Sequence, residues 1–461
     1  MSGPSLVSGW LPSAVQVGVA VLAVGAAGWR TRGWRRRRLP VALAVGVAAA
    51  IGARVWFAAS GLGSSPAPLL LWVWVGVAVA AVAVAGLGWG SDGWGRRVLA
   101  GLVVPASVLC AGIVVNQWTG YVATTSQAFD QLTGAPVPGQ ISGDELAALR
   151  STPQPAMSTG KVVAVSIPST GSGFAHREEY VYLPPAWFTG PAPPSALPVI
   201  MMVGAVLSTP ADWIRAGAAV ATADSYARDH GGYGPILVFV DAVGGVNRDT
   251  ECVNGPHGNA ADHLTGDVRA WVISYLGASA DAARWAVVGW SMGGTCAVDL
   301  GVMHPELFAT FMDISGDLGP TTGTKAQTIT RLYGGDAAAW ARFDPLTVLA
   351  GHPAYRDSAG RFDTAEDSGS AAAEVSAARQ LCTAAARDHI MCTVHTPPGR
   401  HTWAGAARAF ADALPWITTR PGSGVAPLQP PGEPLQDRGP DGAGEPTRSP
   451  PAPRAGSRGT R

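Results

Sequence analysis

The chain has 461 residues, of which 47% are hydrophobic and only 14% are charged, and its formal net charge is zero. The zero charge, and the lack of a basic stripe with interleaved aromatics, exclude nucleic acid as an expected partner. A water-soluble protein usually has a larger charged fraction. The small fraction in this chain indicates that part of it lies in a membrane.

The first 117 residues are predicted to form a transmembrane region. Four apolar windows, each long enough to cross a bilayer core as a helix, cover residues 11–29, 40–59, 67–87 and 98–115. Charged residues are almost absent from these windows, whereas a helix on a soluble protein needs a polar face. We therefore expect four membrane spans in contact with lipid.

Arginine is distributed unevenly between the loops of this region. Six arginines lie between residues 30 and 38, after the first span, and Arg96 and Arg97 follow the third. The amino terminus and the second loop hold no Lys or Arg. The positive-inside rule therefore places the first and third loops in the cytoplasm, with everything after the fourth span on the extracytoplasmic side of the plasma membrane. Because the arginines follow the first apolar run, this run does not resemble a cleaved signal peptide.

From residue 160 onward, strand patterns alternate with helix patterns. Strands are expected at 161–168, 179–184, 197–203, 236–240, 284–288, 311–315, 359–362 and 391–395, and helices at 212–229, 262–276, 295–303 and 404–414. This alternation predicts a doubly wound, mostly parallel α/β sheet over residues 160–420. Residues 118–159 are predicted to be a linker with one short helix, and the Pro/Gly/Arg-rich residues 421–461 a disordered tail.

Residues 289–294, with the sequence Gly-Trp-Ser-Met-Gly-Gly, lie between an expected strand and an expected helix. This is the G-x-S-x-G pattern of a nucleophile elbow, in which a strained turn exposes the serine hydroxyl. Glycine is required two residues before and two residues after the serine, because a Cβ at either position would meet the neighbouring strand or helix. The pattern predicts Ser291 as a nucleophile, and the alternative is an inert serine in a glycine-rich turn.

A serine hydroxyl becomes nucleophilic when a base takes its proton. His401 lies in a Pro/Gly loop, residues 397–403, between the last expected strand and the final expected helix. A loop in that place brings an imidazole back over the elbow, so His401 is the predicted base. His395, within the strand, is the second choice.

The base needs an acid to orient it, and that acid is expected after the penultimate strand. The turn that follows residues 359–362 is rich in carboxylates. We predict Asp367 as the acid, with Glu366 and Asp363 as alternatives. A solvated acidic turn without a catalytic role is the remaining interpretation.

Two backbone N–H groups should form an oxyanion hole. One is the N–H of Met292, directly after the serine, and the other is expected from the loop after strand 197–203, at Val206. This loop begins with Val203-Gly204 rather than the usual His-Gly, so its register stays open by one residue. The same departure allows the alternative that the domain is an inactive, hydrolase-like binding or scaffold protein of the cell envelope.

Four of the five cysteines lie in the half expected outside the cytoplasm, where disulfides form. Cys252 and Cys296 both belong near the carboxyl edge of the sheet, and Cys382 and Cys392 are close in sequence. We predict these two pairs as disulfides. The sequence has no C-x-x-C spacing and no cluster of histidines, so no metal or cofactor is expected.

Six short segments together resemble the putative esterase family of α/β-hydrolases, which includes esterase D, S-formylglutathione hydrolase and the secreted mycolyltransferases of actinobacteria. They are residues 182–187, 203–213, 289–294, 304–308, 313–316 and 398–403. The resemblance covers residues 160 to 418, and four spans ahead of such a domain resemble actinobacterial architectures. It implies an α/β-hydrolase fold, Ser291 as nucleophile, His401 as base and an acid a few dozen residues before it. The expected function is a membrane-anchored serine esterase or acyltransferase that acts on a carboxylic ester of a lipid or an acylated glycan.

Overall fold

The computed structural model describes most of the chain. The described residues are 3–27, 31–60, 67–88, 94–152, 157–189, 195–245, 248–366 and 371–419. The predicted acid Asp367 and the predicted disordered tail lie outside these ranges.

Four amino-terminal helices are long and apolar enough to cross a membrane. They are α1 (Trp10–Ala27), α2 (Leu39–Ser60), α3 (Leu69–Gly88) and α4 (Trp94–Thr119). A short π-helix, η1 (Trp34–Arg38), holds four of the arginines and runs directly into α2. Arg38 donates to the carbonyl of Leu87 at 3.0 Å, so a positive charge lies at the carboxyl end of α3, where it complements the helix dipole.

These helices turn large apolar side chains outward. Most of the exposed large hydrophobic side chains of the described residues lie on α1 to α4, among them Val21, Trp56 and Leu109. In water such a surface would be unfavourable, but in a bilayer it faces acyl chains. Gly46 of α2 and Gly76 of α3 face one another so closely that a Cβ on Gly46 would overlap the Gly76 carbonyl. Small residues at such contacts are typical of helix packing in membranes.

A nine-stranded sheet forms the centre of the second half, in the order β1-β2-β3-β5-β4-β8-β9-β10-β11. Its strands are β1 (Gln140–Ile141), β2 (Lys161–Val165), β3 (Glu179–Leu183), β4 (Val199–Val203), β5 (Ile236–Val240), β8 (Trp285–Trp290), β9 (Thr310–Ile314), β10 (Ala359–Asp363) and β11 (Met391–His395). Strand β3 is antiparallel to β2 and β5, and the remaining pairs are parallel. This arrangement confirms the predicted mostly parallel, doubly wound sheet.

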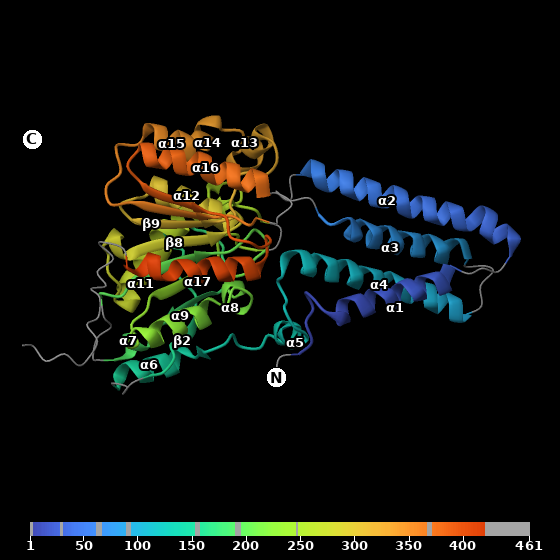
Figure 1. The fold of residues 1–461 in the computed structure, drawn as a ribbon, viewed down its shortest axis with the longest axis horizontal. Helices are drawn as coiled ribbons and strands as arrows, with labels where there is room; N and C mark the ends of the chain where they lie inside the picture. The colour runs from blue at the N-terminus through green and yellow to red at the C-terminus, as the bar shows by residue number, and fades with distance from the viewer. Residues whose placement is uncertain are drawn as a thin grey trace, which may run out of the picture. The chain divides into compact units, whose positions relative to one another are not determined.

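Helices cover both faces of the sheet (Figure 1). One layer holds α6 (Gly143–Ser151), α11 (Arg269–Leu276), α12 (Met292–Met303), α15 (Pro345–Gly351) and α16 (Ala371–Arg387), and the other holds α8 (Asp212–Arg215), α9 (Ala219–Asp229) and α17 (Trp403–Thr419). The alternation of β4 shows why: Val199, Met201 and Val203 pack into the first layer, and Ile200 and Met202 into the second.

The helices differ from those expected from the sequence in three places. The segment expected as one helix over 212–229 is two helices, because Ala218, directly before the second, has a left-handed φ of 49° that a continuous helix does not allow. Helices α13 (Lys325–Tyr333), α14 (Ala337–Phe343) and α15 fill a stretch for which no element was expected. The region predicted as a linker contains α5 (Thr125–Leu132), α6 and the edge strand β1.

Candidate active site

Ser291 occupies the turn between β8 and α12, as the motif predicts. Its φ of 58° and ψ of −124° are strained for a residue with a side chain. The turn is fixed by its backbone: the Ser291 N–H donates to the carbonyl of Ile314 at 2.8 Å, and the Ser291 carbonyl accepts from Gly294 at 2.8 Å. Such strain at the tip of a strand keeps the serine at the carboxyl edge of the sheet, half-exposed to solvent.

The glycines of the elbow are required by close backbone approach. A Cβ on Gly289 would overlap the carbonyl of Gly293, and a Cβ on Gly293 would overlap the carbonyl of Val203 in the neighbouring strand. A Cβ on Gly294 would meet the carboxylate of Asp313 in β9. Each glycine therefore lets α12 start directly against the sheet, which is what presents the serine.

The helix start and the loop after β4 supply candidate oxyanion donors. Met292 is the first residue of α12, a position whose N–H has no acceptor within the helix. In the loop, the Ala205 N–H is already donated to Ser208 Oγ at 3.0 Å, and Ser208 N donates back to the Ala205 carbonyl. Among the described residues, the Val206 N–H has no hydrogen-bond acceptor. This favours Val206 over Ala205 as the second donor, which stays a prediction.

His401 lies against the aromatic residue of the elbow. Its ring centroid is 5.3 Å from that of Trp290, which packs at 4.4 Å on Trp403. Tyr121 packs edge-on against Trp403 at 5.8 Å, and its hydroxyl bonds Ser208 Oγ at 3.1 Å. These rings hold the imidazole loop and the oxyanion loop together. His395, the second choice for the base, is exposed on the edge strand β11.

The carboxylate that contacts His401 is Glu374, in the first turn of α16. Its Oε1 lies 3.2 Å from His401 Nδ1, and the side chains of Glu374 and His401 are 2% and 17% exposed. Neither alternative acid does this. Asp363 binds Arg361 with both oxygens, at 2.7 and 2.8 Å, and Glu366 is exposed. The sequence prediction missed Glu374, and Asp367 is outside the described residues.

A signal for Glu374 is present in the sequence. Residues 374, 377, 378, 381 and 385 share one stripe of α16, and all five are buried. Four of them are Ala or Leu, so Glu374 is a charged residue at a core position of an apolar face. Buried carboxylates are rarely found without a partner, which marks this position for function.

Three further carboxyl groups lie near the elbow. Burial raises the pKa of Asp249 to about 6, although hydrogen bonds with Glu251 and the charge of His257 oppose this, and repulsion from Asp317 adds to it. Burial also raises the pKa of Glu251 and of Asp317. The backbone N–H of Asp317 donates to the Thr295 hydroxyl in the first turn of α12, and the Asp317 carboxylate interacts electrostatically with His401. A pocket of about 260 Å³ is lined by His401 and Trp290.

Both predicted disulfides are present. Cys252–Cys296 joins the loop after β5 to the first turn of α12, next to the elbow, and Cys382–Cys392 joins α16 to β11. Cys110 is buried in α4 as a free thiol. The first bridge fixes the start of the helix that follows the candidate nucleophile.

Comparison with known proteins places the chain in a family. An uncharacterized protein of Corynebacterium glutamicum is 30% identical over 339 residues, which is 71% of this chain and 77% of the relative. The S-formylglutathione hydrolase of Agrobacterium tumefaciens is 18% identical with a TM-score of 0.47, over 58% of this chain and 98% of that one. MPT51 of Mycobacterium tuberculosis is 18% identical with a TM-score of 0.42, over 56% and 97%. Residues 175–417, more than half of the chain, match the family model described as putative esterase. The chain therefore belongs to the putative esterase family.

Proposed function

We propose that the chain is a membrane-anchored, extracytoplasmic serine esterase or acyltransferase that acts through an acyl-enzyme. The observation that carries this proposal is the strained Ser291 elbow at the same sheet edge as the His401–Glu374 pair. Four apolar helices and two disulfides support a membrane anchor and an oxidising compartment.

The proposed reaction follows from the roles of these groups. Ser291 Oγ attacks the ester carbonyl while His401 Nε2 takes its proton, and the N–H groups of Met292 and Val206 stabilise the oxyanion. The protonated imidazole gives that proton to the leaving alkoxide, so an alcohol departs and an acyl-serine remains. Water or a second alcohol then attacks the acyl-serine. The first acceptor gives hydrolysis and the second gives acyl transfer.

An acyl lipid or an acylated glycan is the proposed substrate. The support is the position of the domain, directly after a span, which keeps it within reach of envelope lipids and of wall glycans. The catalytic residues contain nothing that distinguishes water from an alcohol as acceptor.

Labelling with a fluorophosphonate probe tests the proposal. The full-length protein in detergent should be labelled, and Ser291→Ala should not be. Ser315→Ala is a matched control, because Ser315 also has a left-handed φ, of 55°, at the end of the neighbouring strand. Equal labelling of wild type and Ser291→Ala would refute the assignment. Unlabelled wild type that turns over no short p-nitrophenyl ester would favour the inactive scaffold instead.

Product analysis separates the two acyl acceptors. With a p-nitrophenyl ester and added glycerol or trehalose, an acyltransferase should form the new ester faster than free acid. An esterase should form free acid whether or not the alcohol is added. Mass spectrometry of lipids and glycans from cells that carry wild type or Ser291→Ala should then identify the natural acyl group.

A further inference from the structure

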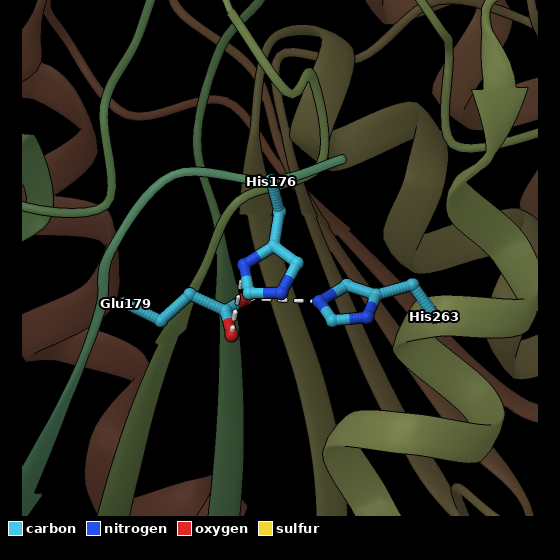
Figure 2. Close-up of side chains that lie close together, drawn as sticks. All are labelled: His176, Glu179 and His263. Atoms are coloured by element: carbon cyan, nitrogen blue, oxygen red, sulfur yellow. Dashed lines mark hydrogen bonds and ion pairs between the residues drawn. The ribbon is translucent and has the colours of Figure 1, made fainter. Parts of the chain in front are cut away.

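Two histidines and a glutamate meet at the start of β3, away from the elbow. His176 lies in the segment before β3, Glu179 is its first residue, and His263 begins η2 (His263–Val268) (Figure 2). Their ligand atoms all lie within 4.8 Å of one another. The side chains of Glu179 and His263 are fully buried, and that of His176 is 10% exposed.

The spacing of the donor atoms suits a small cation. Glu179 Oε1 is 3.3 Å from His263 Nε2, and Glu179 Oε2 is 3.7 Å from His176 Nδ1. Ligands about 2.1 Å from a tetrahedral ion are about 3.4 Å from one another. Glu179 Oε2 is buried and accepts no hydrogen bond among the described residues, so it has a coordination site to offer.

The outer nitrogen of each ring is held as in bound metal sites. His263 Nδ1 is 3.4 Å from a carboxylate oxygen of Asp267, and His176 Nε2 is 2.8 Å from the carbonyl of Ile167. A metal-binding histidine nearly always donates its second N–H to a carboxylate or a carbonyl, which fixes the tautomer and aims the other nitrogen at the ion. Both rings of this cluster have that arrangement.

The two imidazole rings are stacked at 4.3 Å, and acceptors surround them. His176 Nδ1 also faces the carbonyl of Arg177 at 2.8 Å, and the two nitrogens of His263 face Glu179 and Asp267. Two carboxylates therefore converge on this pair of rings. Buried carboxylates are usually paired with a cation or bound to a metal, and a divalent cation between the rings would balance the charge of both.

We propose that His176 Nδ1, Glu179 and His263 Nε2 bind a divalent transition-metal ion, with Zn²⁺ the best match to two imidazoles and one carboxylate. The fourth position falls to a water. The ligands come from two segments far apart in the sequence, so the ion joins the start of β3 to the start of η2. Its role is structural, because Ser291 and His401 belong to other elements.

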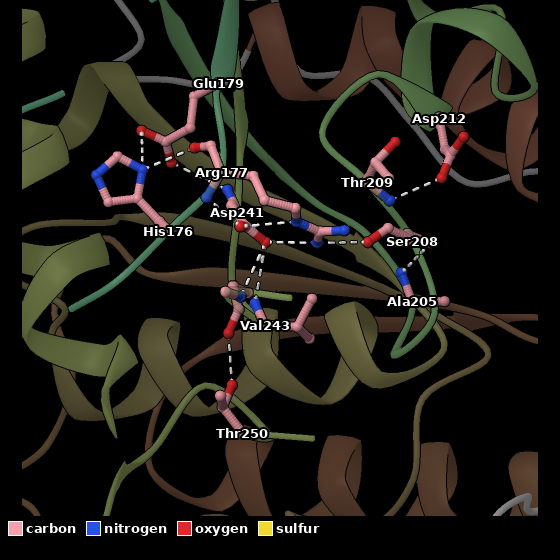
Figure 3. Close-up of polar contacts among 12 residues, drawn as sticks. His176, Arg177, Glu179, Ala205, Ser208, Thr209, Asp212, Asp241, Val243 and Thr250 are labelled. Carbon is pink, nitrogen blue, oxygen red and sulfur yellow. Dashed lines mark hydrogen bonds and ion pairs between the residues drawn. The ribbon is translucent and has the colours of Figure 1, made fainter. Parts of the chain in front are cut away.

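Polar contacts connect this site to the oxyanion loop (Figure 3). Glu179 Oε1 accepts from the N–H of Asp241 at 2.9 Å, and the Asp241 carboxylate binds the Arg177 guanidinium at 2.7 and 2.9 Å. Arg177 Nη2 donates to the carbonyl of Ser208 at 2.7 Å, in the turn that contains Ala205. An ion that fixes Glu179 would therefore also stabilise the loop that carries the candidate oxyanion donor.

Metal analysis of the full-length protein in detergent tests the proposal. The protein is stripped with EDTA, supplied with ZnCl₂, desalted and measured by plasma mass spectrometry. Wild type should retain one zinc per chain and melt at a higher temperature with zinc than without. Glu179→Gln and His263→Gln should retain none. His304→Gln, which changes a surface histidine paired with Glu306, should behave as wild type.

Two results would overturn the site. One is wild type that retains no zinc and whose melting temperature does not respond to it. The other is equal zinc in wild type and His263→Gln. If the variants fail to fold, the stripped wild type decides alone: Co²⁺ should give the visible d–d bands of a four- or five-coordinate site, and their absence would refute the proposal.

Discussion

Replacing Glu374 with Gln tests the identity of the catalytic acid. The Glu374 carboxylate, 3.2 Å from His401 Nδ1, keeps the Nδ1–H tautomer and leaves Nε2 free to accept the proton of Ser291. The amide of Gln can present an N–H to Nδ1 and so stabilise the wrong tautomer. In triads of this kind, loss of the acid costs about 10³- to 10⁴-fold in kcat, or about 4 to 5.5 kcal/mol in the activation barrier. We expect a loss of this size in Glu374→Gln.

The assay is hydrolysis of a short p-nitrophenyl ester by the full-length protein in detergent, with Asp367→Asn as the matched control. Folding is checked by the melting temperature, so that a fall in kcat is not mistaken for unfolding. The expected result is a large fall in kcat for Glu374→Gln and an unchanged kcat for Asp367→Asn. The reverse pattern would refute the reasoning and restore Asp367 as the acid. A large fall in both would show that the two carboxylates act together.

Three further predictions concern the surroundings of the elbow. Tyr121→Phe removes the hydroxyl that bonds Ser208 and should lower kcat about 2- to 10-fold, the value of one hydrogen bond, at unchanged KM; an unchanged kcat would contradict this. Changing both Cys252 and Cys296 to Ser removes a disulfide that joins residues 44 apart in the sequence. The free energy of unfolding, measured with urea, should fall by about 4 kcal/mol because the unfolded chain gains entropy. A change near zero would contradict this entropic account. The raised pKa of Asp249 means that its carboxyl stabilises the fold below about pH 4 and that this contribution is lost as pH rises through about 6. Asp249→Asn should therefore gain stability over wild type, by up to about 3 kcal/mol, at pH 7 but not at pH 4, as melting temperatures across that range would show.

The elbow could be predicted because its constraints are local. A Cβ on Gly289, Gly293 or Gly294 would meet backbone atoms or a carboxylate, either of the elbow itself or of a neighbouring strand. The need for glycine at these positions is therefore visible in the motif. The mostly parallel, doubly wound sheet was likewise predictable, since alternating strand and helix patterns admit few topologies. The Cys252–Cys296 disulfide followed from the same reasoning about strand ends, and the Cys382–Cys392 disulfide from closeness in sequence.

The acid was harder to predict because its place depends on packing. The sequence predicts an acidic turn after β10, and it favours Asp367 in that turn over Glu366 and Asp363. In the structure β10 is followed by helix α16, whose first turn brings Glu374 to His401 from 27 residues away. The helix is alanine-rich and begins beyond the acidic turn, so only the position of Glu374 on its buried stripe distinguishes this carboxylate from the others.

The cluster of His176, Glu179 and His263 shows a second limit of sequence reasoning. The expectation of no metal rested on the absence of closely spaced ligands, which is a test for compact zinc motifs alone. His176 and His263 are 87 residues apart, and they meet because β3 pairs antiparallel with β5 and the ring at the start of η2 stacks on that of His176. When the fold brings side chains together from distant segments, the sequence shows no characteristic spacing between them. Such a cluster becomes visible only when the pairing of the strands is known.

The segment directly after α4 packs on the candidate active site. Composition predicted a linker here, yet Tyr121, two residues beyond the end of α4, is half-buried against Trp403 and Trp290 and bonds Ser208. These three residues belong to the imidazole loop, the elbow and the oxyanion loop. A residue tied to all three cannot shift without moving the groups that the proposed reaction needs. The strand pattern first becomes recognisable at residue 160. The folded unit that contains the candidate active site begins before that residue, because Tyr121 already contacts the site.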